Sequence, residues 1–168
     1  MGAEIKKTTS FSGRQLDLEC LQSMDHPSTS FVEVTPSVTF DTPKIVAGPQ
    51  KLAQRYAVLF TTVIGSDIMD PDFGTTLFGR IDHGNFGGYT EVNLLANEAN
   101  IATKQRIIAA DNDTDTYGKI PDDEKLKDSW ISRVVVDKNT RTIDVFVKIL
   151  TVAGEDITFV VPTPSGIY

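Results

Sequence analysis

The chain has 168 residues, a length that can bury one sizeable core, so one domain with extensions is the default expectation. Apolar residues make up 40% and charged residues 23% of the chain, a balance typical of a globular protein. The formal net charge of −7 argues against a basic nucleic-acid-binding surface. The single cysteine, Cys20, excludes an intramolecular disulfide framework, and no apolar run approaches the roughly 20 residues of a membrane span.

The N-terminal part of the chain is polar and weakly patterned. Residues 1–30 carry scattered Ser, Thr and Gly, and we interpret them as an extension that either orders on a partner or is a disordered tail. Residues 31–40 alternate apolar and polar side chains around Pro36. They predict a short edge strand, because proline cannot donate a ladder hydrogen bond. The domain itself is therefore expected to span residues 31–168.

Two helices are predicted in the middle of the chain. Pro49 suits the first turn of a helix, and apolar residues then recur at three- and four-residue steps until Gly65, a natural stop. Thr90 is expected to cap a second helix over about 90–110. Between the helices, the four glycines of residues 79–89 predict a loop. The side chains expected to share one face of the second helix are Leu94, Leu95, Glu98, Ile101, Ala102, Gln105 and Ile108.

The last third of the chain changes its hydrophobic period. Residues 111–125 are rich in Asp, Asn and Gly and are expected to be solvated. Apolar residues then recur at every second position, which predicts strands at 134–136, 143–149 and 157–161 on short turns. The predicted fold class is α+β, with two main helices packed on a small antiparallel sheet and a C-terminal β-meander. The strand at 157–161, ended by Pro162, is expected to form the free edge.

Residues able to carry chemistry are few. His83 lies in the glycine-rich loop and Cys20 in the N-terminal extension, and an exposed histidine and an incidental thiol are the favoured interpretations. Glu91 and Glu98 lie along one predicted helix, and a glycosidase pair is one interpretation of them, while ordinary surface acids are the favoured one. The aspartates of residues 111–122 resemble a calcium loop in spacing but lack its glycine and its bidentate glutamate. We therefore expect no catalytic residue, no cofactor and no metal.

Residues 51–78 (KLAQRYAVLFTTVIGSDIMDPDFGTTLF) combine a helix pattern with a turn that holds no His, Cys or Lys. This run resembles the core of the small baseplate-wedge, or sheath-initiator, family of contractile phage tails, which also occurs in type VI secretion baseplates. That family shows Thr-x-x-Gly-Glu-Arg at the end of a helix, followed by Pro-x-Phe-Gly. The matching residues are Thr62, Gly65, Met69, Pro71, Phe73, Gly74 and Leu77, while Ser66 and Asp67 stand where Glu-Arg is usual.

A second segment carries the same resemblance. Trp130, Ile131, Ser132, Arg133 and Val134 open the first predicted strand of the meander. The family has a Glu-Pro-Arg motif just before a strand, often after an aromatic residue. Arg133 falls at the family's arginine, and Ile131 and Ser132 replace Glu-Pro. The resemblance covers roughly residues 45–162, with the elements in the same order.

The resemblance implies a non-enzymatic structural component of the virion, in the baseplate of a phage tail assembled in the host cytoplasm. Its implied partners are baseplate wedge proteins, tail sheath subunits and tail tube or hub proteins, in a ring of multiple copies, without nucleic acid or membrane. A sheath arm adding a strand at Thr158 and Val160 would template the first sheath ring by β-augmentation. The alternatives are another tail protein, such as a neck or terminator component, and a peptidoglycan hydrolase.

Six further residues are candidates for partner contact. Met69, Pro71 and Phe73 either pack beneath the first helix or face a partner, and both interpretations stay open. Trp130 beside Ser132 belongs to the core or to an interface, with the core favoured. Arg133 is flanked by apolar residues at a strand entry, where bidentate capture of a carboxylate suits its guanidinium.

Overall fold

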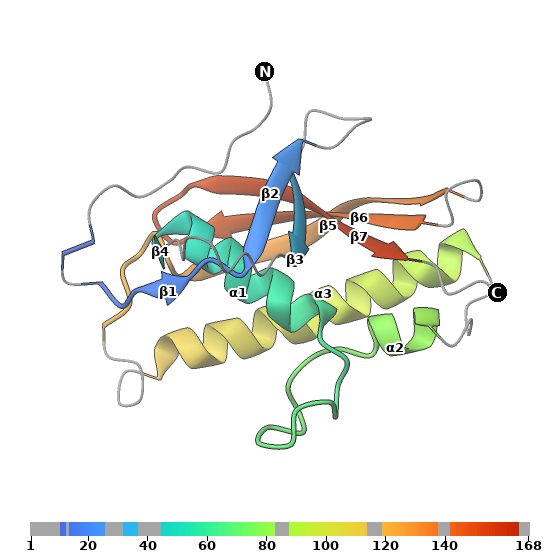
Figure 1. The fold of residues 1–168 in the computed structure, drawn as a ribbon, viewed down its shortest axis with the longest axis horizontal. Helices are drawn as coiled ribbons and strands as arrows, with labels where there is room; N and C mark the ends of the chain where they lie inside the picture. The colour runs from blue at the N-terminus through green and yellow to red at the C-terminus, as the bar shows by residue number, and fades with distance from the viewer. Residues whose placement is uncertain are drawn as a thin grey trace.

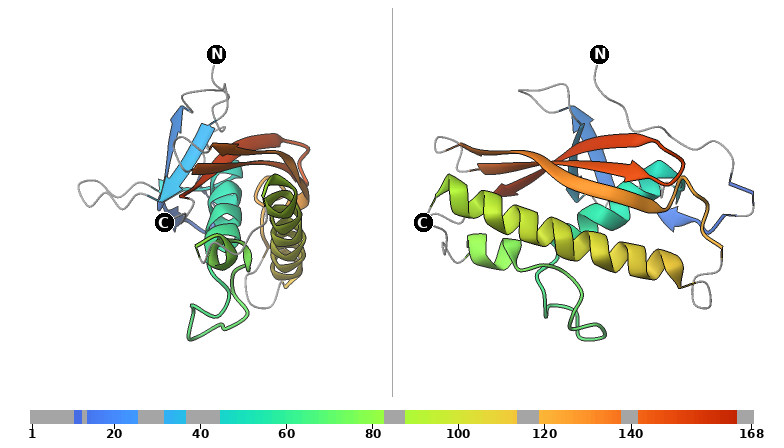
Figure 2. Two further views of the ribbon diagram at one scale, coloured as in Figure 1. Left: turned by 90° about the vertical axis from the view of Figure 1, so that its right-hand side faces the viewer. Right: turned by 180° about the vertical axis from the view of Figure 1, so that it is seen from behind.

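The computed structural model describes residues 11–12, 14–25, 32–36, 45–82, 88–113, 119–137 and 142–164. The fold is α+β, as predicted. Helices α1 and α3 lie side by side against one face of a five-stranded sheet, and α2 contacts both helices (Figures 1 and 2). The helices are α1 (Pro49–Thr61), α2 (Leu77–Asp82) and α3 (Tyr89–Asn112). No helix in the described part of the chain combines the length and apolar character that a membrane span requires.

The large sheet has the strand order β2-β3-β7-β6-β5. Its strands are β2 (Leu21–Asp25), β3 (Val32–Pro36), β5 (Leu126–Asp137), β6 (Thr142–Thr151) and β7 (Asp156–Pro164). All its pairs are antiparallel except β3 with β7, which is parallel. The antiparallel β5-β6-β7 arrangement confirms the predicted meander, but β5 begins at Leu126 rather than at residue 134. A second, two-stranded sheet joins β1 (Asp17–Leu18) to β4 (Ile45–Val46).

Two predictions about strand position are wrong. β7 is not an edge strand, because Phe159 and Val160 pair with Val32 and Glu33 on the side away from β6. β3 is an internal strand for the same reason, and Pro36 lies at its end, where the missing donor is tolerated. The segment 17–25, expected to belong to a separate extension, forms β1 and β2 and pairs within the chain.

Helix α1 follows the prediction closely. Pro49 lies in its first turn after Gly48, and its apolar stripe of Leu52, Tyr56 and Phe60 is fully buried. The helix ends at Thr61, and the next residue donates its backbone N–H to the Val58 carbonyl oxygen at 3.0 Å. The predicted stop at Gly65 lies in the turn beyond this end.

Helix α3 is present, but two details differ from expectation. It begins after Gly88, whose φ is 122°, and Thr90 is inside the first turn rather than the cap. The expected apolar face is wrong in part: Leu95 is buried and Ile108 packs against the core, but Leu94 and Ile101 are 58% and 51% exposed. The face that packs inward is built from Val92, Leu95, Ala96, Ala99, Asn100, Thr103 and Ile107. Small residues on this face let α3 approach the sheet closely. A prediction based on the positions of large apolar residues therefore selects the wrong face of the helix.

The loop predicted at 79–89 is partly helical, because α2 occupies residues 77–82. Its Leu77 and Ile81 are fully buried beneath α1 and α3, which explains why the glycine at 79 does not prevent a helical turn. Residues 83–87, including His83, lie outside the described residues.

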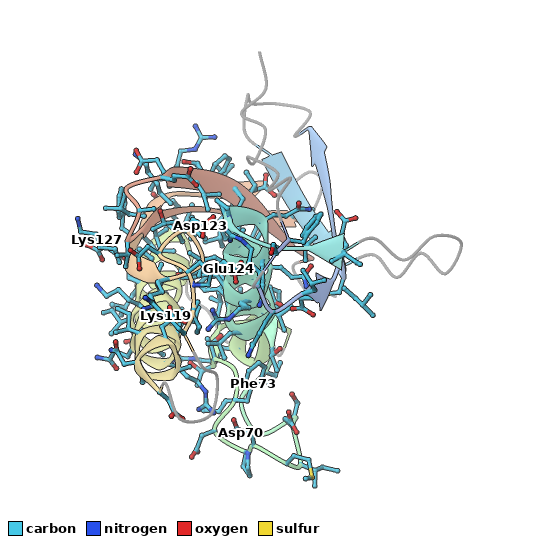
Figure 3. All side chains as sticks on the ribbon, turned by 90° about the vertical axis from the view of Figure 1, so that its left-hand side faces the viewer. Asp70, Phe73, Lys119, Asp123, Glu124 and Lys127 are labelled. Carbon is cyan, nitrogen blue, oxygen red and sulfur yellow. The ribbon has the colours of Figure 1, made fainter. Side chains whose placement is uncertain are left out.

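The acidic segment 111–125, which begins in the last turn of α3, is not wholly solvated. Asp111 is 5% exposed, pairs with Arg55 at 2.8 Å and accepts the Leu126 backbone N–H at 2.9 Å. Glu124 is 1% exposed and accepts the Gly48 backbone N–H at 2.8 Å (Figure 3). These carboxylates are buried because they satisfy backbone donors and cations of distant segments, which composition alone does not reveal. Residues 114–118 lie outside the described residues.

The core between helices and sheet contains one polar chain. The Tyr56 hydroxyl donates to Asn100 Oδ1 at 2.5 Å, and Asn100 Nδ2 donates to the Ser129 carbonyl oxygen at 3.2 Å. Burial raises the pKa of the Tyr56 hydroxyl. The chain links α1, α3 and β5, and fixes their register more specifically than apolar contact would.

Candidate functional site

Within the described part of the chain, the candidate catalytic residues do not form one cluster. Glu91 pairs with Arg80 at 3.2 Å, and Glu98 is exposed on the same helix. Cys20 is half-buried, and its backbone N–H donates to Gln54 Oε1 at 2.9 Å. Burial, and then the nearby Asp17 carboxylate, raise the pKa of the Cys20 thiol. Within the described ranges, no group of three or more His, Cys, Asp or Glu side chains is arranged to hold a metal ion.

Residues 63–75 form a loop that projects beyond the helices, and we call it the tip loop (Figure 1). Ile68 is 93% exposed and Met69 is 92% exposed, and Pro71 is also exposed. Phe73 is half-buried and packs against the core. Packing beneath the first helix is therefore wrong for Met69 and Pro71. Phe73 packs against the core, where the guanidinium of Arg106 from α3 lies over its ring.

The base of the tip loop is closed by backbone hydrogen bonds. Thr75 N–H donates to the Thr62 carbonyl oxygen at 2.8 Å, and Ile64 N–H donates to the Thr75 carbonyl oxygen at 3.0 Å. The Thr75 hydroxyl adds a bond to the Phe60 carbonyl oxygen at 2.9 Å. Gly74, with φ 106°, makes this approach possible, because only glycine fits that close to Thr62.

Helix α3 supports the loop from the side. Arg106 forms an ion pair with Asp70, donates to the Asp72 carbonyl oxygen at 3.0 Å, and lies 5.7 Å from the Phe73 ring centroid. Phe73 N–H in turn donates to the Asp70 carbonyl oxygen at 2.9 Å (Figure 3). Met69 N–H donates to Asp67 Oδ1 at 2.9 Å, so hydrogen bonds stabilise the backbone of the loop as far as Met69. The tip loop thus presents its exposed side chains from a fixed backbone.

A second surface lies on the sheet face opposite the helices. It comprises Trp130, Ser132 and Arg133 of β5, and we call it the β5 outer surface. A bulge places Ile131 opposite Val147 but Arg133 opposite Phe146, so one extra residue, Ser132, lies between these pairs. Ile131 therefore packs against the core while Arg133 is directed outward.

Side chains of β6 contact this surface. Lys148 Nζ lies 5.2 Å from the Trp130 ring centroid and also pairs with Asp156 at 3.1 Å. The Arg133 guanidinium carbon lies 4.4 Å from the Phe146 ring centroid, a cation–π distance. Ser132 Oγ donates to the Phe146 carbonyl oxygen at 3.1 Å. Trp130 is 38% exposed, so the interpretation that it belongs to the core is wrong.

The expected carboxylate partner of Arg133 is not found among the described side chains, where its contact is with an aromatic ring. Its predicted capture of a partner carboxylate stays a prediction. Val160 does not line an open edge, because it is buried and pairs with both Phe146 and Glu33. Thr158 pairs with Lys148 of β6 and precedes Phe159, where the pairing with β3 begins. Strand addition at Val160 is therefore wrong, and the role of Thr158 stays a prediction.

Two residues that shape these surfaces were not predicted. Ile68 precedes Met69 in the same turn, and its position between two turn residues could have marked it as exposed. The local sequence around Arg106 does not indicate its role, because that role depends on α3 passing beside the tip loop. Arg106 and its partner Asp70 are 36 positions apart in the chain.

The chain was compared with protein-family models, with curated proteins and with solved structures, and none of the three comparisons produced a match. The resemblance to the baseplate-wedge family therefore rests on the two sequence segments alone. Residues 51–78 form most of α1, the tip loop and the start of α2, and Trp130–Val134 lie in β5, where three of them make up the β5 outer surface.

Proposed function

We propose that this chain is a non-enzymatic adaptor of a contractile tail baseplate, which joins wedge and hub proteins and templates the first sheath ring by β-strand addition. The strand added by a sheath subunit pairs with β5. The chain acts in multiple copies arranged in a ring. This proposal keeps the assembly suggested by the resemblance, and it moves the contact from β7 to the strand that is terminal in the described sheet.

The position of β5 is the observation that carries the proposal. It spans Leu126–Asp137, which makes it the longest strand of the described sheet, and it has a paired neighbour only on the β6 side. An unpaired edge exposes backbone N–H and C=O groups to any strand that can reach them, so natural proteins usually keep free edges short or covered. A long terminal strand is therefore best explained by a partner that pairs with it.

The chemistry of β5 suits a reversible partner strand. The bulge at Ser132 and the charged side chains Lys127 and Asp128 discourage indiscriminate edge-to-edge pairing. Trp130 and Arg133 flank the edge on the outer face, where an aromatic ring and a guanidinium can select side chains of the incoming strand. Main-chain bonds would supply affinity and these side chains specificity.

The positions of the two segments that resemble the baseplate-wedge family support the same assembly. The helix-plus-turn segment and the Trp130–Val134 segment lie on opposite sides of the molecule, on the helix side and on the sheet side (Figure 2). An adaptor needs two such surfaces, because it must hold one class of protein while recruiting another.

Hydrogen exchange tests the proposal on the intact chain. Backbone amides would be followed by mass spectrometry in the purified protein, alone and with the sheath subunit of the same particle. We expect new protection in residues 126–137 and none at Phe159 and Val160 of β7, which pair with both β3 and β6 and serve as the internal control. Protection confined to β2, the other terminal strand, or absent from the sheet altogether, would contradict the assignment.

The non-enzymatic part of the proposal has its own test. The purified chain is expected to leave peptidoglycan intact in a zymogram, because the acids considered for hydrolysis lie apart on the surface. Clearing that disappears on substitution of a single Glu or Asp would show that the chain is a hydrolase instead.

A further inference from the structure

We infer that the tip loop is a second interaction site, which inserts Ile68 and Met69 into an apolar pocket of a partner protein whose rim carries Lys or Arg. The site is distinct from the β5 edge, and the inference does not depend on the partner being a baseplate protein. It follows from the exposure, the rigidity and the charge of the loop.

Exposure is the first observation. Ile68 and Met69 are adjacent, and both are more than 90% exposed at the end of a projecting loop. Single exposed apolar residues are ordinary on protein surfaces. Two large ones together at a protruding tip can instead be buried completely by one concave surface, and side chains buried that way dominate the energy of interfaces. The shape of the tip therefore calls for a pocket rather than a flat surface.

Rigidity is the second observation. The loop is closed at its base by Thr62 and Thr75, and Arg106 supports it from α3 through Asp70, Asp72 and Phe73. A segment that only connects two helices does not require this support. Holding the tip in place before binding reduces the ordering entropy that a flexible loop would lose on association, so the bracing favours affinity.

Charge is the third observation, and it selects the kind of partner. Residues 63–75 contain Asp67, Asp70 and Asp72 and no Lys, Arg or His, so three aspartates against the one supporting arginine, Arg106, give a local net charge of −2. Acidic groups around an apolar tip complement a basic rim around an apolar pocket and speed encounter with it. The same charge disfavours insertion into an anionic membrane surface.

The position of the loop leaves both surfaces available at once. The tip loop projects on the helix side, whereas the β5 outer surface lies on the opposite face of the sheet (Figures 1 and 2). A partner at the tip need not compete with a strand added at β5. The chain can therefore bridge two different proteins.

Photo-crosslinking in the full chain identifies the partner. A benzophenone amino acid would replace Met69 in one variant and Val152 in another, and both would be produced together with the proteins encoded beside this chain. Val152, 46% exposed beyond β6, is the matched control. We expect a crosslink from position 69 to a protein whose crosslinked peptide lines an apolar pocket bordered by Lys or Arg. No crosslink, or one only to lipid or to a second copy of the chain, would overturn the inference.

The purified pair then measures the contact. Ile68→Asp with Met69→Asp should weaken binding about 30-fold or more, the effect of losing an interface hot spot, while Val152→Asp should leave it unchanged. Asp67→Asn with Asp72→Asn should slow association and reduce its dependence on salt. The melting temperatures should stay at the parent value, because the substituted tip side chains contact no core residue. Equal weakening by the Val152 variant, or none by the tip variant, would contradict the inference.

The outcomes separate this inference from the proposed function. A crosslink from position 69 to an apolar pocket bordered by Lys or Arg, without protection of β5 by a sheath subunit, would end the proposed function and leave the tip site intact. Protection of β5 by a sheath subunit, without any crosslink from position 69, would do the reverse.

Discussion

Gly74 approaches Thr62 so closely that a β-carbon on Gly74 would lie 2.5 Å from the Thr62 carbonyl oxygen. The same oxygen accepts the backbone N–H of Thr75 at 2.8 Å, so the contact closes the base of the tip loop. A residue other than glycine would have to displace backbone, since no flexible side chain stands in the way. The exposed tip thus depends on a backbone contact at its base.

Gly74→Ala tests that dependence against Gly65→Ala. Both glycines have positive φ, 106° and 82°, but a β-carbon on Gly65 meets nothing within 4 Å. Gly65→Ala should therefore cost only backbone strain, about 1–3 kcal/mol, and Gly74→Ala should cost more because a clash is added. Urea unfolding of both variants provides the measurement. Equal losses would show that the approach to Thr62 relaxes without cost.

Tyr56→Phe tests the polar chain in the core. The substitution removes the donor to Asn100 Oδ1, and because Asn100 is 5% exposed, water does not replace the bond. We expect a loss of about 1–3 kcal/mol in the free energy of unfolding, the cost of a buried unpaired acceptor. Tyr89→Phe, at a tyrosine that is 54% exposed, is the control and should change stability little. A neutral Tyr56→Phe would mean that Asn100 finds another donor.

Glu124→Ala tests the buried carboxylate beside α1. It would leave the Gly48 N–H without its acceptor and remove one of the two carboxylate partners of Arg14, at 2.9 Å, and the partner of Lys51 at 3.4 Å. Partial exposure of both cations moderates the loss, which we expect at about 2–4 kcal/mol. Asp123→Ala breaks a half-buried pair with Arg14, which keeps Glu124 as a partner, and should therefore cost less than Glu124→Ala. Thermal melts of the two variants should show this order, and the reverse order would contradict it.

Arg133→Ala should leave the fold intact and weaken assembly. Its guanidinium is exposed over the Phe146 ring, so the isolated chain loses little. If the partner buries a carboxylate against Arg133, the complex loses about 2–5 kcal/mol. Arg80→Ala, at an exposed arginine on α2, is the control. Normal assembly of the Arg133 variant, or a melting temperature far below the parent, would show that Arg133 does not act through a partner.

The Cys20 thiol should react slowly in the folded chain. Burial and the Asp17 carboxylate raise its pKa, so a smaller fraction is thiolate at any pH below that raised value. Alkylation at pH 8 should therefore be slower in native protein than in urea-unfolded protein, and the rate should keep rising at pH values where the unfolded thiol has levelled off. Identical rate–pH profiles for the two states would contradict the shift.

The elements that the sequence predicted correctly are those with strong local patterns. Pro49 and the spacing of Leu52, Tyr56 and Phe60 defined α1, and the alternation through Val145 and Val147 defined β6. Local periodicity decides these cases because one face of each element is buried along its whole length.

The features that could not be predicted depend on pairing between distant segments. The parallel pairing of Val32 with Phe159 makes β7, the expected edge strand, an internal strand. No local sequence pattern predicts this pairing. Leu94 and Ile101 misled the prediction for α3, because the helix buries alanines against the sheet instead. The candidate surfaces were located by motif, but the support of the tip by Arg106 appeared only in three dimensions.

A cryo-electron microscopy map of the assembled particle that contains this chain tests the central claim most directly. The account predicts the chain in a ring at the baseplate end of a contractile sheath, with a strand of a sheath subunit paired along Leu126–Asp137 of β5. A map in which β5 faces solvent, or in which the chain lies in the neck of the tail, would contradict it.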